Sequence, residues 1–463
     1  MAAITTIVPV RRAILGPGLI IHITVLAAII FFQSFYSEGH ADYIYHTIYS
    51  VFFIESAVLS CYIINKSLIS GLFCLSYVLL FMTNPLLISF GVVEYYGSSL
   101  TLISSNLLIG MGYVFFVLGL VVSDLLIGSV EKDRVLYSSE GLLWASKRMQ
   151  EAVIIGFFVF LGIMLASGVN PLVAEKSVRV QGGGISLIYA LFVYFLLMAP
   201  MSIFLSGASG NLFKVRNILF VIFVVVANFA VYRIRSFPIA IILSFYFGYV
   251  FYRKGFLITE GLKIASIPKY MALIFVVVLL VVGVAILRSG FVSGFDNIDM
   301  ERAEIIIRRS IERTDLGYAY YVRQALERFP QFHPFLNGDS YLRILYGFAP
   351  FVERPELTAY VFANEVVDGV VGRVSVSPGV IGDAYINFGY WGGGIVMFLW
   401  GCFFNLIRPL SLRWMTVIST MGMWLPYLVR GNFNNTVYLL IAAYLISLMA
   451  DKLYFSRSIV GRE

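Results

Sequence analysis

The chain has 463 residues, of which 60% are hydrophobic and only 13% are charged, and its mean hydropathy is +0.88. A soluble domain carries about 25% charged residues, so this composition excludes a soluble globular protein and predicts an integral membrane protein. The formal net charge of +7 indicates cytoplasmic loops held by anionic lipid. No basic run is long enough to follow a phosphodiester backbone, so we expect no nucleic-acid partner.

The N-terminal segment and the cysteines give no sign of export processing or disulfides. Arg11 and Arg12 precede the first long apolar stretch without a clear small-residue cleavage site, so we expect a retained first span rather than a removed signal. The cysteines at positions 61, 74 and 402 all fall in apolar segments. This indicates small buried side chains rather than a disulfide framework or a metal site.

Apolar stretches recur along the chain with short connections between them. A bilayer core of about 30 Å needs roughly 20 apolar residues per helix. The sequence predicts twelve spans, near residues 13–33, 43–64, 68–90, 102–127, 152–168, 185–206, 217–232, 237–252, 269–287, 392–407, 414–430 and 436–452. The predicted fold is therefore an all-α polytopic membrane protein. Nine transmembrane helices lie in residues 1–287, one large, mostly helical loop in 288–391, and three helices with a tail in 392–463.

The distribution of lysine and arginine predicts the orientation. If the N-terminus is cytoplasmic, the positive charges gather in the even-numbered loops, at Lys66, Lys132, Arg134, Lys147, Arg148, Lys214, Arg216, Arg253, Lys254, Lys263, Lys269, Arg408 and Arg413. The odd-numbered loops 34–42 and 91–101 carry no lysine or arginine. Both termini are then cytoplasmic and the large loop is outside, which in a Gram-negative cell is the periplasm of the inner membrane.

Several arginines break this rule. Arg233 and Arg235 lie in a tight outside turn, Arg430 lies in another, and Arg179 lies in the loop 168–184. An arginine near the membrane is costly and is usually kept for a partner. A single one is explained equally well by a side chain that reaches the lipid headgroups. Several on one face favour an anionic ligand.

The large outside loop carries arginines but no lysine. The planar guanidinium fits phosphate oxygens in a bidentate manner and does not deprotonate. Residues 298–329 predict one or two amphipathic helices that pack over the membrane domain, and Pro330, Pro334 and Asn337-Gly338 end them.

The sequence contains no pattern for a metal or nucleotide. The four histidines have no ligand spacing, and neither a P-loop nor a GxGxxG sequence is present. We therefore expect no metal and no cofactor. No GxSxG turn supports a Ser/His/Asp triad, although the sequence does not exclude one.

The segment from Gly382 to Gly389 contains the strongest candidate for acid–base chemistry. If residues 381–390 are helical, Asp383 and Asn387 share one face and Tyr385 lies on another. Asp383 is then a candidate general base. The alternative is a polar re-entry helix in which Asp383 caps the helix or pairs with a nearby arginine.

Three segments resemble motifs of the bacterial O-antigen polymerase (Wzy) group, which polymerises oligosaccharide repeat units. Asn337-Gly338-Asp339-Ser340-Tyr341 through Phe348–Pro355 resembles its Gly-x-Ser-Tyr … Ile-Pro-Arg … Pro segment, except that Phe351 stands where arginine is usual. Ser377–Gly389 resembles the Gly-(Asp/Glu)-x-Tyr-x-Asn-x-Gly motif, and Leu428–Gly431 resembles the Arg-Gly after the penultimate span. These motifs cover about a fifth of the chain, and the remainder matches in architecture only.

The resemblance implies a metal-independent inverting glycosyltransferase with a GT-C-like fold. It would transfer a growing glycan from undecaprenyl pyrophosphate to the next lipid-linked repeat unit on the periplasmic face. Implied partners are both lipid-linked glycans, membrane lipids and a chain-length regulator protein.

The residue types fit such a reaction. Positioned arginines stabilise charge on the leaving pyrophosphate, and a base activates the acceptor hydroxyl. Expected catalytic residues are Asp383, Arg373, Arg430, Arg233 and Arg235, and expected substrate-binding residues are Arg179, Asp339, Tyr341, Tyr385 and Asn387. Further candidates for the base are Asp339, Glu365, Asp368 and His333, the last of which is more often structural between an aromatic residue and a proline.

Two other functions stay open. An O-antigen ligase shares the general plan, passes the glycan to the lipid A core, and would be favoured by an essential histidine, for which His333 is the only candidate in the loop. A flippase or exporter of lipid-linked oligosaccharide would only bind the glycan, and carriers of this kind often have internal repeats and mid-membrane ionisable residues. Glu55 is the main mid-span charge here, and a helix–helix hydrogen bond also accounts for it.

Overall fold

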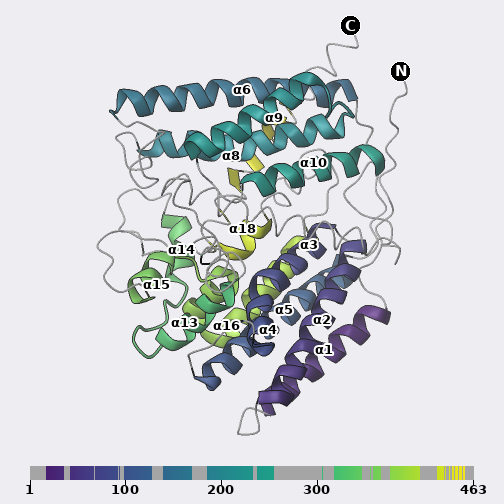
Figure 1. Ribbon diagram of the computed structural model, residues 1–463, viewed down its shortest axis with the longest axis vertical. Helices are drawn as coiled ribbons and strands as arrows, with labels where there is room; N and C mark the ends of the chain where they lie inside the picture. The colour runs from purple at the N-terminus through teal and green to yellow at the C-terminus, as the bar shows by residue number, and fades with distance from the viewer. Residues whose placement is uncertain are drawn as a thin grey trace.

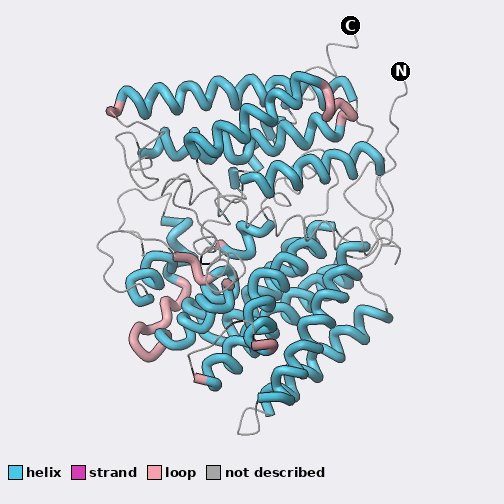
Figure 2. The backbone as a smooth tube through the Cα atoms, in the orientation of Figure 1, coloured by secondary structure: helices cyan, strands magenta, loops and turns pink. Residues whose placement is uncertain are grey.

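The computed structural model describes residues 17–35, 42–66, 68–91, 93, 98–127, 139–168, 185–232, 237–254, 305, 317–346, 355, 358–366, 376–406 and 425–431, and short pieces between 433 and 453. These residues form helices joined by turns, without strands (Figure 2). The first ten elements are α1 (Pro17–Phe35), α2 (Asp42–Lys66), α3 (Leu68–Tyr77), η1 (Val78–Met82), α4 (Thr83–Ser89), α5 (Ser99–Ile127), α6 (Ser139–Ala166), α8 (Ile185–Ala208), α9 (Val215–Ala227) and η2 (Asn228–Tyr232). They are followed by α10 (Phe237–Lys254), α13 (Tyr318–Arg328), α14 (Asp339–Tyr346), α15 (Thr358–Val366), α16 (Gly379–Leu406) and α18 (Leu425–Arg430).

Four helical segments in the described part of the chain are long and apolar enough to cross a membrane. They are Thr47–Ile64, Ser70–Ser89, Leu100–Leu126 and Ser139–Ala166. Large apolar side chains stay exposed on them, including Ile54, Leu126 and Ile155, as expected of helices that face lipid. The described part of the chain is therefore all-helical, with four candidate membrane-spanning helices. The number of twelve spans, the outside loop and the orientation remain predictions. The predicted span 269–287 and residues 414–424 of the predicted span 414–430 lie outside the described residues.

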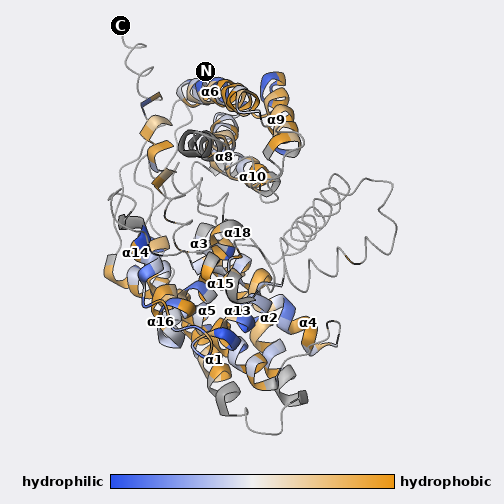
Figure 3. Ribbon diagram, turned by 90° about the vertical axis from the view of Figure 1, so that its left-hand side faces the viewer, coloured by the Kyte–Doolittle hydropathy of each residue, from blue (hydrophilic) through white to orange (hydrophobic). Residues whose placement is uncertain are grey.

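The helices form two groups. Figures 1 and 3 show α6, α8, α9 and α10 together, apart from a larger group that contains α1 to α5, α13 to α16 and α18. In the first group α8 packs between α6 and α10, and in the second α16 packs along α5. The elements of the predicted outside loop, α13 to α15 and the start of α16, thus belong to the same body as the N-terminal helices.

Glycines allow α5 and α16 to approach closely. A Cβ atom on Gly119 would lie 2.1 Å from the Phe398 carbonyl oxygen, and one on Gly401 would lie 2.0 Å from the Phe116 carbonyl oxygen. Helices in a membrane associate through such small residues because no hydrophobic force drives them together. This contact fixes the second half of α16 against a candidate span.

The first group begins earlier than the sequence indicates. The sequence predicts a span at 152–168 after a polar connection, but α6 already begins at Ser139. Its early polar residues face its neighbours: Ser146 Oγ lies 2.6 Å from Ser206 Oγ, and Gln150 Nε2 donates to Asn217 Oδ1 over 2.9 Å. Ser146 and Gln150 are internal to the bundle, so their polarity did not mark a loop.

Candidate active site

The first part of α16 is a buried segment that contains polar side chains. Residues 378–387 are all buried, with Asp383 1% exposed and Asn387 fully buried. The helix begins at Gly379 with φ of 76°, where a Cβ atom would lie 2.4 Å from the Phe81 ring. Only glycine adopts this backbone at such close contact without strain. The segment resembling a polymerase motif is therefore a core element.

Gly389 bends α16 sharply, with φ of 69° and ψ of −164°. A Cβ atom on Gly393 would lie 3.3 Å from Ile381 Cδ1, although twelve residues of straight helix would separate them by about 18 Å. The bend also frees the Ile386 carbonyl oxygen, which accepts a hydrogen bond from the Leu336 amide at 3.0 Å. The chain before Gly389 thus turns back beside the chain after it.

A polar network joins this segment to α14 and α15. Ser340 Oγ donates to Asn387 Oδ1 at 2.8 Å, and Thr358 Oγ1 donates to Ser340 Oγ at 2.8 Å. The Asn387 amide donates to the Asp383 carbonyl oxygen at 2.8 Å and to Thr358 Oγ1 at 3.2 Å. The i,i+4 relation between Asp383 and Asn387 agrees with the predicted helix. Asn387 fixes α14 and α15 against α16, since all of its polar atoms are used.

Asp383 lies beside this network and before the predicted span 392–407. Its Oδ2 accepts a hydrogen bond from the Phe433 amide at 2.9 Å, and its Oδ1 has no hydrogen-bond partner among the described residues. Burial raises the pKa of the carboxyl from 3.8 to about 6, although the Thr358 hydroxyl, the Phe433 amide and the Tyr341 hydroxyl each lower it. A carboxyl with a pKa near neutrality exchanges protons readily at physiological pH.

Tyr341 covers the carboxyl together with Phe433. Their rings stack at 4.1 Å between centroids and 6° between planes, and the Phe388 ring meets Tyr341 edge-on at 5.3 Å. The Tyr341 hydroxyl is buried beside the Asp383 carboxyl, but the two make no hydrogen bond of ordinary geometry within the described residues. Burial raises the pKa of Tyr341, and the Asp383 charge raises it further. A buried carboxyl and a buried hydroxyl whose hydrogen bonding is incomplete mark this place as unusual.

Arg430 ends α18, three residues before Phe433. Three residues of extended chain span at most about 11 Å, so the Arg430 backbone lies within that distance of the Phe433 amide that holds Asp383. Its guanidinium lies 5.6 Å from the centre of the Tyr318 ring, in a cation–π contact. The Arg430 backbone therefore lies close to the amide that binds Asp383.

Arg323 is a second arginine of this region, and the sequence analysis did not select it. It is 4% exposed, and its NH2 donates to Asn84 Oδ1 at 2.8 Å. From the sequence, its helix was expected only to pack over the membrane domain. A signal was available, because Arg323 lies in the same apolar stripe as Ala319, Val322 and Leu326. A charge within an apolar stripe needs a buried partner.

The remaining predicted residues have other environments. The Tyr385 hydroxyl donates to the Phe329 carbonyl oxygen at 2.8 Å, and Asp339 is exposed in the first turn of α14. His333 Nδ1 lies 2.7 Å from the Pro334 carbonyl oxygen, and its ring packs at 5.2 Å from Phe329. Glu365 lies in α15. Asp339 and His333 are thus not part of the network around Asp383.

Five predicted residues lie outside the described part of the chain: Arg179, Arg233, Arg235, Asp368 and Arg373. The gathering of Arg430 with these arginines at one site therefore remains a prediction. In the described residues, no group of three or more His, Cys, Asp or Glu side chains converges.

Comparison with protein-family models, with curated proteins and with solved structures found no match for this chain.

Proposed function

We propose that this protein is a glycosyltransferase that polymerises undecaprenyl-pyrophosphate-linked oligosaccharide repeat units on the outer face of the bacterial inner membrane. One observation carries the proposal. Described parts of the first two segments that resemble the polymerase motifs, and the chain just after the third, are far apart in the sequence and lie close to Asp383 or Asn387. Ser340 binds Asn387 across 47 residues, and the chain after Arg430 binds Asp383 through Phe433 across 50 residues.

In the proposed reaction, the acceptor hydroxyl of one lipid-linked repeat unit attacks the anomeric carbon of the growing glycan. A new glycosidic bond forms, the bond to the pyrophosphate oxygen breaks, and undecaprenyl pyrophosphate leaves. Asp383 takes the proton of the acceptor hydroxyl. Its pKa of about 6 suits this task, because the carboxyl is mostly ionised at neutral pH and is still basic enough to accept a proton. Inversion at the anomeric carbon is what the resemblance implies.

Arg430 neutralises the charge that develops on the leaving pyrophosphate. A guanidinium donates two parallel N–H bonds to the oxygens of a polyprenyl pyrophosphate, and a lysine ammonium does not. Stabilisation of developing charge is usually the largest catalytic contribution. Arg373, Arg233, Arg235 and Arg179 remain proposed partners of the same pyrophosphate, with Arg179 in a binding role.

The ring pair Tyr341–Phe433 controls access to the base in this proposal. Asp383 is 1% exposed, and a general base must come within about 3 Å of the proton it takes. The substrate therefore reaches Asp383 only when Phe433 and Tyr341 separate. Because Phe433 follows Arg430 by three residues, we expect binding of the pyrophosphate at Arg430 to displace Phe433.

The proposal is tested by replacing Arg430 in cells that make the native repeat unit. Arg430→Lys and Arg430→Gln should each reduce long-chain glycan on a gel by roughly 100-fold, because a point charge does not replace the guanidinium fork. Arg328→Lys is the matched control. Arg328 also lies over an aromatic ring, at 5.5 Å from the Phe332 centroid, and has no assigned role in the reaction. Near-normal glycan from both Arg430 variants, at wild-type protein levels, would contradict the assignment.

A further inference from the structure

We propose that the α6–α9 groove binds an anionic phospholipid, with one acyl chain along the groove and the phosphate at the basic residues beside it. This site is separate from the one around Asp383, and it does not depend on the proposed function. The ligand class is a glycerophospholipid with a net negative headgroup.

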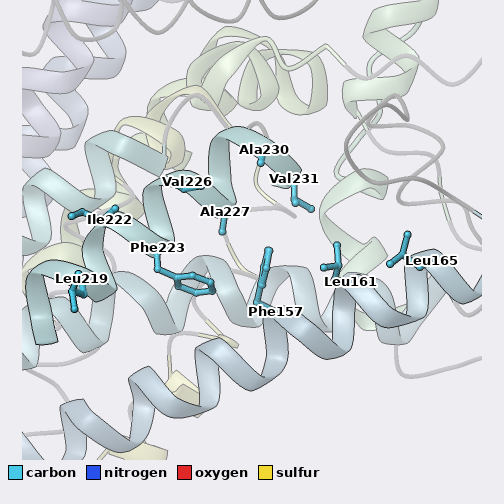
Figure 4. Close-up of a pocket in the computed structure, with 10 residues that line it drawn as sticks. All are labelled: Phe157, Leu161, Leu165, Leu219, Ile222, Phe223, Val226, Ala227, Ala230 and Val231. Carbon is cyan, nitrogen blue, oxygen red and sulfur yellow. The ribbon is translucent and has the colours of Figure 1, made fainter.

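The groove is apolar over its whole length. It has a volume of about 510 Å³ and is lined by Phe157, Leu161, Leu165, Leu219, Ile222, Phe223, Val226, Ala227, Ala230 and Val231. Figure 4 shows α6 contributing one side, and α9 with η2 contributing the other. The thirteen residues from Leu219 to Val231 span about 18 Å along the helix, close to the thickness of one leaflet, about 15 Å. One acyl chain fits this length.

One end of the groove is basic. On α9 the stripe 219, 223, 226, 230 continues one turn back to Arg216, and on α6 the stripe 157, 161, 165 continues back to Gln150. Arg216 Nε donates to Gln150 Oε1 at 3.3 Å, so these two side chains close the groove at this end. A headgroup that leaves the groove here meets a guanidinium first.

The charges around this end favour an anion. The positive residues are Lys147, Arg148, Lys214 and Arg216, and the carboxylate among them is Glu151. Glu151 is shared by Arg216, at 3.1 Å, and Arg148, at 2.8 Å. Four positive charges against one negative charge leave a net charge of +3. Both arginine side chains are about half exposed, at 45% and 55%, so each can add a phosphate oxygen to the Glu151 contact.

Basic side chains at the end of an apolar groove between helices are the chemistry that selects an anionic headgroup over a zwitterionic one. A zwitterionic lipid would fill the same groove, but its positive headgroup would face these cations. The groove accounts for binding of the acyl chain, and the basic end accounts for the preference for an anionic headgroup.

The test uses the purified full chain in detergent, with phosphatidylglycerol and phosphatidylcholine of identical acyl chains added in equal amounts. Lipid retained on the intact protein is measured by native mass spectrometry. We expect the wild type to retain phosphatidylglycerol preferentially. The double variant Arg148→Gln, Lys214→Gln should lose the preference, at about fivefold for each basic residue removed. Arg328→Gln, in the other helix group, should keep it.

A second pair of variants tests the groove. Val226→Trp fills the groove and should reduce retention of both lipids, whereas Ile155→Trp, at an exposed α6 position that does not line it, should not. Equal retention of the two lipids by the wild type would overturn the proposal. So would a phosphatidylglycerol preference that survives in the basic double variant, or full retention in Val226→Trp. Loss of bound lipid on addition of inorganic phosphate alone would also overturn it, because it would show that the groove contributes nothing.

Discussion

At the scale of single residues, the polar interior of this protein is organised by Asp383 and Asn387. Asn387 uses its amide fully, in bonds to Ser340, Thr358 and the Asp383 backbone. Asp383 has one carboxyl oxygen bound by an amide and one without a hydrogen-bond partner in the described residues. The first residue is a structural connector, and the second retains capacity for a proton or a ligand.

The buried carboxyl predicts a pH dependence of stability. Burial raises the pKa of Asp383 to about 6, above its model-compound value of 3.8. A raised pKa in the folded state means that the protonated form is favoured by folding. This contribution is fully present below pH 3.8 and is lost as the pH rises through about 6. The difference between these two pKa values corresponds to a change of about 3 kcal/mol in the free energy of unfolding.

The variant Asp383→Asn should remove this contribution to the pH dependence. Asparagine is neutral at every pH and has an oxygen that can accept the Phe433 amide. We expect thermal unfolding of the purified protein in detergent to show a wild-type stability that falls between pH 4 and pH 7, and a smaller fall in Asp383→Asn. The same pH dependence in both proteins would show that Asp383 is not the group that titrates.

The local part of this site was predictable from the sequence, and the tertiary part was not. The spacing of Asp383 and Asn387 follows from helix periodicity alone. The contacts with Ser340, Thr358 and Phe433 join residues that lie 29 to 50 positions apart in the sequence. No local pattern specifies such contacts. Arg323 was missed because it lies in the charge-rich segment 298–329, in which a single arginine does not stand out.

At the scale of elements, α16 decides where the site is. A straight helix from Gly379 to Leu406 would carry Asp383 away from the Phe398 and Gly401 contacts with α5. The bend at Gly389 instead returns the buried segment to the middle of α5, where Ile381 lies next to Gly112. The sequence predicted a helix over 381–390 that enters a span. It did not predict the bend within α16, because the bend depends on Gly389 and the segment contains several other glycines.

The bend predicts that Gly389→Ala is strongly destabilising. Its φ of 69° and ψ of −164° lie in a region that is essentially restricted to glycine. We expect a loss of about 1–3 kcal/mol in the free energy of unfolding, measured by denaturant titration in mixed micelles.

Gly162→Ala is the matched control for this variant. Gly162 lies within α6, and a Cβ atom there would meet nothing within 4 Å. Alanine at an open helical position should be neutral or stabilising by about 1 kcal/mol. Equal stability of Gly389→Ala and Gly162→Ala would rule out the bend as a constraint on the fold.

At the scale of the whole molecule, the positive-inside pattern assigns the two ends of the helices to opposite sides of the membrane. The site region follows α13, and the turn between α8 and α9 carries the basic residues at the end of the groove. Phe332 is 69% exposed in the first region and Phe213 is 80% exposed in the second. We predict that these residues face opposite aqueous compartments.

Single cysteines test this orientation, in a chain whose native cysteines are replaced by alanine. Phe332→Cys should react with a membrane-impermeant maleimide in intact spheroplasts, and Phe213→Cys should react only after permeabilisation. The two positions are matched as exposed phenylalanines outside helices. The reverse labelling pattern would place the Asp383 region in the cytoplasm and remove the proposed donor lipid from its reach.

The central claim is that this chain, by itself, joins lipid-linked glycans. The most direct measurement is incubation of the purified protein with the lipid-linked repeat unit, without added metal, nucleotide or lipid A core. We predict a ladder of longer products on undecaprenyl pyrophosphate, greatly slowed in Asp383→Asn although that variant still binds the repeat unit. Unchanged substrate without a ladder would contradict the account, and transfer that starts only when lipid A core is added would identify a ligase instead.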